Sequence, residues 1–146
     1  MGRRAIDAKR QARARKEAAG AAAPARRRKP PAPAVSLEFA RAIARLLSED
    51  KCDDIVVLDL RGRSSVCDYF VIGTGTSHRQ MRAAADHVDE LATPRGERLF
   101  TSAGLEDGLW VVLDYVDVVV HLFNGVQRTF YELETLWGEA PRVEWR

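Results

Sequence analysis

The sequence predicts a single α+β domain that follows a basic N-terminal arm. Three observations support this fold class: two stretches carry apolar residues at helical spacing, several short β-branched runs lie between and after them, and the first 34 residues have a composition unsuited to a packed core. The segments follow the order α-β-β-α-β-β-β-α, which favours a mixed sheet with mostly antiparallel strands. We place the domain at residues 35–146, a length sufficient for a hydrophobic core.

The arm, residues 1–34, differs from the rest of the chain in charge. It contains eleven Lys and Arg against two acidic residues, a net charge of +9, whereas residues 35–146 contain 12 against 19, a net charge of −7. The arm is rich in Ala and Pro and has no aromatic residue, so it cannot bury enough surface to offset the entropy cost of ordering. We predict that it is disordered and either contacts RNA phosphates non-specifically or only adds solvated charge.

The first half of the domain is predicted to form a helix and two strands. Ser36 is a candidate N-cap, and the residues after it form one apolar stripe: Phe39, Ile43, Leu46 and Leu47. Residues 55–60 are apolar without alternation, which indicates a strand buried on both faces. Residues 61–63 form a turn, and residues 66–72 form the next strand.

A second amphipathic helix follows the glycine-containing loop Gly73–Ser77. Its apolar positions follow the i, i+3, i+4, i+7 rule: Met81, Ala84, Ala85, Val88, Leu91 and Ala92. The loop at its start has backbone N–H groups that can hold a phosphate, but Ser77 and Gln80 also match a capping box. We favour capping. The helix ends at residues 93–96, and a short strand is expected near residues 98–101.

Residues 109–123 predict a β-hairpin with two chemically different faces. If Tyr115 and Val116 form a two-residue loop, the opposed pairs are Asp114–Asp117, Val112–Val119 and Trp110–His121. One face would then be apolar: Leu109, Val111, Leu113, Val118, Val120 and Leu122. The other would hold an aromatic, an imidazole and two opposed carboxylates, which suits contact with another molecule. A final short helix is marked by Phe130, Leu133 and Trp137.

Other candidate sites have less support. Cys52 and Cys67 have no metal-like spacing, and His78 and His87 fall on opposite sides of the second helix. The sequence therefore predicts no metal, cofactor or catalytic nucleophile. It contains no apolar run long enough for a membrane span and no signal-peptide core, so we predict a cytoplasmic protein, with organelle import by the basic arm as the alternative.

Several motifs together resemble the ribosomal silencing factor family, RsfS, also called Iojap-like. The resemblance runs from about Ser36 to Trp137, and its motifs occur in the family order: DIVVLD at 54–59, SSVCDYF at 64–70, GTGTS at 73–77 with Arg79 and Gln80, ADHV at 85–88, WVVLD at 110–114, DVVVH at 117–121, and FYELE at 130–134 with Leu136 and Trp137. The basic arm lies outside this resemblance. Family members often have Gly at the position of Val116, where a β-branched residue with positive φ would be strained.

The resemblance implies a non-catalytic factor with a degenerate nucleotidyltransferase-like fold, which is often a homodimer when free. It implies binding to the large ribosomal subunit through ribosomal protein uL-fourteen, a block to subunit joining, and repression of translation under nutrient limitation. Combined with the hairpin, it makes these partner-binding candidates: Trp110, Asp114, Tyr115, Asp117 and His121, with Tyr69 and Arg79 as weaker ones. The alternatives are a large-subunit assembly factor and a Mg²⁺-dependent nucleotidyltransferase that uses the Gly73–Ser77 loop with Asp59 or Asp68.

Overall fold

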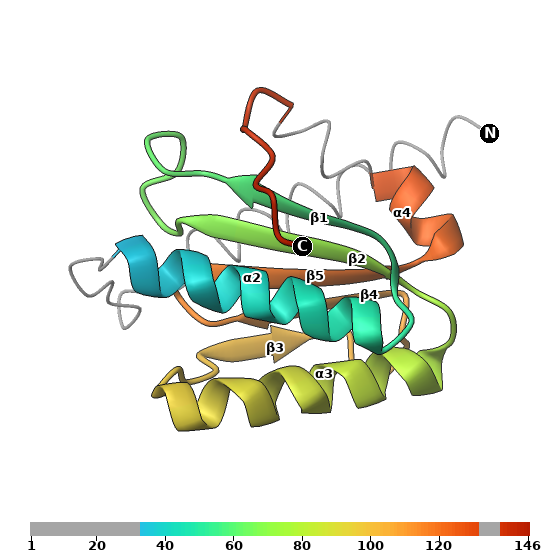
Figure 1. The fold of residues 1–146 in the computed structure, drawn as a ribbon. Helices are drawn as coiled ribbons and strands as arrows, with labels where there is room; N and C mark the ends of the chain where they lie inside the picture. The colour runs from blue at the N-terminus through green and yellow to red at the C-terminus, as the bar shows by residue number, and fades with distance from the viewer. Residues whose placement is uncertain (1–32, 132–137) are drawn as a thin grey trace.

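The computed structural model describes residues 33–131 and 138–146, so the predicted arm lies outside the described residues except for its last two (Figure 1). The elements are α2 (Pro33–Glu49), β1 (Asp53–Asp59), β2 (Tyr69–Gly75), α3 (His78–Ala92), the 3-10 turn η1 (Thr93–Arg95), β3 (Thr101–Ala103), β4 (Trp110–Asp114), β5 (Val118–Asn124) and α4 (Gly125–Tyr131). Helices and strands follow the predicted order, and the α+β class is confirmed.

The five strands form one mixed sheet in the order β1-β2-β5-β4-β3. Only β2 and β5 pair in parallel, and the other neighbours are antiparallel. Helices α2 and α3 lie side by side on one face of this sheet (Figure 1). Helix α4 lies on the other face, where Arg128 Nη1 donates a hydrogen bond of 2.8 Å to Thr74 Oγ1 of β2.

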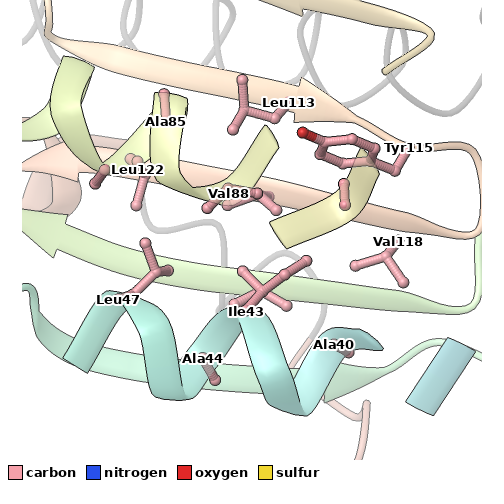
Figure 2. Packing of buried hydrophobic residues seen from close by; sticks show 14 of the residues in the cluster. Ala40, Ile43, Ala44, Leu47, Ala85, Val88, Leu113, Tyr115, Val118 and Leu122 are labelled. Atoms are coloured by element: carbon pink, nitrogen blue, oxygen red, sulfur yellow. The ribbon is translucent and has the colours of Figure 1, made fainter. Parts of the chain in front are cut away.

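The main core fills the space between the sheet and the α2–α3 layer (Figure 2). The predicted stripe of α2 is buried at Phe39, Ile43 and Leu47, while Leu46 is half-buried at its border. The buried residues of α3 are five of the six predicted ones: Met81, Ala84, Ala85, Val88 and Ala92. Both helices therefore form because one stripe of each packs on the same sheet face.

A second, smaller core covers the opposite face of the sheet. Its members come from β1, β2, β4, β5 and neighbouring loops: Val56, Leu58, Leu60, Cys67, Phe70, Ile72, Trp110, Val112, Val119, Phe123 and Ala140. In β1, Val57 faces the main core while Val56 and Leu58 face the second. This arrangement confirms the prediction that the non-alternating first strand is buried on both faces.

Three element boundaries differ from the prediction. Helix α2 begins at Pro33 rather than after Ser36, because proline needs no partner for a backbone N–H in the first turn. Strand β2 begins at Tyr69 rather than residue 66, since Ser64 Oγ accepts from the amides of Val66 and Cys67 and holds that segment in a turn. The third strand covers residues 101–103 rather than 98–101.

Helix α3 is capped by the two predicted residues, Ser77 and Gln80, although Gln80 bonds the amide before the N-cap residue rather than that of Ser77 itself. Ser77 Oγ accepts a hydrogen bond of 3.0 Å from the Gln80 amide, and Gln80 Oε1 accepts one of 3.1 Å from the Thr76 amide. Gly96, with φ of 74°, follows η1 at the end of the helix. The predicted final helix is seen as α4, which begins at Gly125; Leu133 and Trp137 lie outside the described residues.

The β4–β5 hairpin has a different register from the predicted one. The observed partners are Trp110–Phe123, Val112–His121 and Asp114–Val119, which is a shift of two residues. The turn is therefore centred on Val116 and Asp117, and the predicted pairs Asp114–Asp117, Val112–Val119 and Trp110–His121 are wrong. Because side chains alternate with a period of two, this shift leaves each strand residue on its predicted face.

The C-terminal segment covers the outer edge of β1. The Asp59 amide donates to Pro141 O and the Val143 amide to Val57 O, each at 2.8 Å. Trp145 Nε1 donates to Ile55 O at 3.3 Å. The sheet edge at β1 is thus paired with the chain's own backbone, while all three residues of β3 at the opposite edge are exposed.

Candidate functional site

Five of the seven predicted partner-binding residues are buried. Trp110, Asp114 and His121 have no exposed surface, Tyr69 likewise has none, and Tyr115 is 2% exposed. Asp117 is half-buried and Arg79 is exposed. The buried residues therefore shape the domain from inside, and only the last two present side chains to solvent.

Trp110 and His121 are brought together as diagonal neighbours inside the second core. Trp110 Nε1 donates a hydrogen bond of 3.1 Å to His121 Nδ1, which requires that this nitrogen carry no proton. The indole stacks on Phe123 with ring centroids 4.9 Å apart, and the imidazole meets the edge of Phe70 at 4.5 Å. The indole N–H of Trp110 and Nδ1 of His121 are thus bonded to each other within the protein, among four packed rings.

The hairpin turn is held by Asp114 and Tyr115. Asp114 Oδ1 accepts a hydrogen bond of 2.8 Å from the Val116 amide, so the carboxylate fixes the turn instead of opposing Asp117. The Asp117 amide donates to Tyr115 O at 3.0 Å, which forms a γ-turn around Val116 with φ of 75°. Val116 is the only β-branched residue with positive φ among the described residues. This is the strained position that the sequence indicated.

Tyr115 connects the hairpin to both helices. Its hydroxyl donates to Asp89 Oδ1 of α3 at 2.9 Å, and its ring meets Phe39 of α2 edge to face at 5.4 Å. Burial and the bond to Asp89 raise the pKa of Tyr115 well above its usual value. The tyrosine therefore stays protonated over the ordinary pH range and fixes the turn against α2 and α3.

Tyr69 and Arg79 lie at opposite ends of the domain. Tyr69 begins β2 beside the hairpin turn, and the guanidinium of Arg61 lies over its ring at 5.5 Å. Burial raises the pKa of Tyr69. Arg79 lies in the first turn of α3, at the end of the sheet where β2 finishes. The structure therefore does not bring these two residues together into one site.

The Gly73–Ser77 segment is mostly strand instead of loop. Both glycines belong to β2, and a Cβ on Gly75 would collide with Met81 Cγ. Because the Thr76 and Gln80 amides donate to side chains of the capping box, those amides are occupied. The glycine at position 75 is thus explained by close packing of strand and helix, and the cap uses two of the amides that a phosphate-binding loop would need.

Asp59, His78 and His87 are each engaged in a separate local contact. Arg61 binds Asp59 with two hydrogen bonds of 2.8 and 3.0 Å, which hold the pKa of that carboxyl below its usual value. His87 Nδ1 lies 2.6 Å from Asp50 Oδ2, and His78 Nε2 lies 2.8 Å from Leu105 O. Within residues 33–131 and 138–146, no group of three His, Cys, Asp or Glu converges as a metal site requires.

Exposed apolar side chains mark a surface that the sequence interpretation missed. Val35, Leu99 and Phe100 are 56%, 37% and 39% exposed, and Val116 is half-buried. Phe100 is placed level with Tyr115 because its amide donates to Asp114 O at 2.8 Å. The sequence feature from which this surface could have been predicted is the adjacent pair Leu99 and Phe100, just before the short exposed strand β3. We call these four residues the tip patch.

None of the described helices is sufficiently long and apolar to cross a membrane. This finding holds for the part of the chain that the structure describes.

Comparison with known proteins gives consistent matches to one family. Residues 33–146 match the sequence model described as "Ribosomal silencing factor during starvation". The chain is 41% identical over 103 residues to ribosomal silencing factor RsfS of Bacillus subtilis, covering 70% of this chain and 87% of that protein. It is 36% identical over 107 residues to RsfS of Halalkalibacterium halodurans, covering 73% and 92%. The chloroplastic protein Iojap of Arabidopsis thaliana is 35% identical over 111 residues, 76% of this chain and 46% of that protein.

Two solved structures share the fold. A crystal structure of a protein from Chromobacterium violaceum is 34% identical, with a TM-score of 0.67, and the match covers 70% of this chain and 85% of that one. A crystal structure from Bacillus halodurans is also 34% identical, with a TM-score of 0.62 and coverage of 74% and 95%.

Proposed function

Because the chain belongs to the ribosomal silencing factor family, we propose that it binds the large ribosomal subunit and represses translation by blocking association with the small subunit. The match over residues 33–146 carries this proposal, since it spans every element of the described fold. The specific partner proposed is ribosomal protein uL-fourteen, and the role is repression when nutrients are limiting.

The charge of the domain supports a basic partner. Residues 35–146 have a net charge of −7, which favours encounter with a basic ribosomal protein. The arm has the opposite charge, and we propose that it contacts ribosomal RNA beside the docked domain. In this proposal the domain binds a ribosomal protein and the arm binds RNA. The protein acts in the cytoplasm and needs no cofactor.

The buried hairpin residues have an indirect role in this proposal. Trp110, His121 and Tyr69 maintain the sheet, while Asp114 and Tyr115 hold the turn in place. Asp117 and Arg79 remain candidates for direct contact because their side chains reach solvent. We propose no catalytic step, because blocking subunit joining requires only occupancy of a surface.

Co-sedimentation with purified ribosomal subunits tests the proposal. We expect the full chain to sediment with large subunits in a sucrose gradient and to be absent from small subunits. Adding it before the subunits are mixed should lower the light scattering that reports 70S formation. If the protein stays in the light fractions, or binds large subunits without slowing their joining, the proposed function is wrong.

A nucleotide-binding measurement distinguishes the proposed function from the nucleotidyltransferase alternative. Calorimetry with Mg²⁺ and nucleoside triphosphates should give no binding heat, because Asp59 is held by Arg61 and the β2 glycines are packed in a strand. Saturable heat would favour the nucleotidyltransferase.

A further inference from the structure

Several helices and strands begin or end at the end of the sheet that carries the hairpin turn. Asp59 of β1 pairs with Tyr69 of β2, and Tyr69 pairs with Val118 of β5, so the loops beyond these residues lie at one end. The bond from Tyr115 to Asp89 brings the last turns of α3 to the same end, and the ring contact with Phe39 brings the start of α2 there. Figure 1 shows the beginnings of α2 and β3 on this side.

The tip patch lies around the hairpin turn at this end. Val35 is one helical turn before Phe39 and shares its side of α2, and Phe100 lies opposite Tyr115 across the strands. Leu99 precedes Phe100 in the segment before β3 and is also exposed. Among the described residues, three of the five exposed large apolar side chains belong to this group. A group of exposed apolar side chains is more often a binding surface than a single exposed apolar side chain is.

The hairpin turn is rigid as well as strained. Val116 has φ of 75°, which a β-branched residue avoids, and it is held there by Asp114 Oδ1 and by the γ-turn bond. Strain that is imposed by surrounding bonds occurs often at ligand contacts. The turn therefore holds Val116 in one fixed position, as a preorganised surface requires.

The charges around the patch favour a protein partner over a nucleic acid. Arg61 is neutralised by its two bonds to Asp59. The loops at this end also contain Arg63, Arg95 and Arg98 together with Glu97 and Asp117, so they carry charges of both signs. A surface that binds phosphates needs an excess of positive charge. An apolar centre with a mixed polar rim is typical of a protein–protein interface.

We propose that the tip patch is the docking surface for a basic protein with an apolar surface patch of its own, which the acidic domain attracts by complementary charge. This inference rests on the proposed function, in which that protein belongs to the large subunit. Phe100 is the central anchor, since an aromatic side chain supplies large contact area. Helix α2 begins at Pro33, two residues before Val35, so the arm is joined to the domain next to the tip patch in the chain.

The test measures binding of the full chain to purified large subunits, using the double variant Leu99→Ser, Phe100→Ser. We expect binding at least about tenfold weaker, at low and at high salt alike, because the lost contacts are apolar. Leu109→Ser is the matched control: Leu109 is 39% exposed but lies at the other end of β4, and its removal should leave binding unchanged. Deletion of residues 1–32 should instead weaken binding in a salt-dependent way.

The outcomes separate the two proposals. If the wild-type chain does not bind large subunits, the proposed function fails and this inference fails with it. If the wild type binds and the double variant binds equally well, only the tip patch is refuted. Circular dichroism checks folding, and Phe100→Ser alone serves if the double variant does not fold.

Two further results would also refute the tip patch. One is a double variant that loses binding to a labelled single-stranded RNA while it keeps normal affinity for the ribosomal protein. The other is a double variant whose only change is self-association, measured by light scattering.

Discussion

The hydrogen bond between Trp110 and His121 is predicted to stabilise the fold, and Trp110→Phe tests it. The substitution keeps an aromatic ring beside Phe123 but removes the indole N–H that His121 Nδ1 accepts. Loss of this donor at a fully buried acceptor costs about 1–3 kcal/mol. The smaller ring leaves unfilled volume, which costs about 1 kcal/mol more. The expected total is about 2–4 kcal/mol out of the 5–15 kcal/mol typical of a domain.

Urea denaturation followed by far-UV circular dichroism measures this loss, and the melting temperature should fall by roughly 8–16 °C. A double-mutant cycle with His121→Phe isolates the bond. Because replacing both partners removes the buried unsatisfied group, the double variant should be more stable than the sum of the single effects by about 1 kcal/mol or more. Leu109→Ala, on an exposed side chain, is the control.

A loss of less than about 0.5 kcal/mol for Trp110→Phe would refute the reasoning, since that is the size of an ordinary surface substitution. Additive single effects would show that the two side chains are not coupled. Retained binding to large subunits by Trp110→Phe, where it remains folded, is also expected, because the side chain has no exposed surface.

Three other predictions concern glycine, histidine and the C-terminal segment. Gly104→Ala should destabilise the fold by more than about 2 kcal/mol, because φ is 82° and the new Cβ would collide with Trp110 O. Gly62→Ala should destabilise it by only about 1 kcal/mol, because φ is 78° but the space around it is open. Urea denaturation measures both losses. His87 has its pKa raised by the hydrogen bond and charge of Asp50, so its stabilising contribution is complete below pH 6.5 and is lost as the pH rises through the folded-state pKa. NMR titration should place that pKa above 6.5, and Asp50→Asn should lower it. Truncation after Ala140 removes three hydrogen bonds to β1 and should cost about 2–4 kcal/mol, with increased self-association by light scattering as the edge opens.

Each of these has a clear contrary result. Equal losses at Gly62 and Gly104 would mean that the collision is relieved by relaxation. A His87 pKa that does not respond to Asp50→Asn would remove the ion pair as its cause. A truncated chain that is monomeric and equally stable would show that the C-terminal segment does not protect the sheet edge.

Local patterns were sufficient for the elements and their order. The helical spacing of Met81, Ala85 and Val88 identified α3, and the Ser77–Gln80 pair identified its start, because both depend on residues within a few positions of each other. The alternation in residues 110–122 assigned the hairpin side chains to the correct faces, since the period of two is independent of register.

The family resemblance came from motifs read in the sequence, and the comparisons confirm it. The exact strand pairing did not follow from the same residues. The predicted hairpin was two residues out of register because it assumed a two-residue loop of Tyr115 and Val116. The actual turn is centred on Val116 and Asp117, and the positive φ of Val116 is held there by the bonds from Asp114 and Tyr115.

The sequence by itself determined the fold class, the order of elements, the face of each hairpin side chain and the family. Only the tertiary structure decided which polar residues are available to a partner. Trp110, Asp114 and His121 looked like a surface because their side chains are polar or aromatic, yet all three are buried. Their face of the sheet carries the second core, whose members include Leu60, Cys67 and Ala140 from distant parts of the chain. The exposed tip patch arises in the same way: Val35, Phe100 and Val116 are far apart in sequence, and the pairing of strands and the packing of α2 bring them to one end of the sheet.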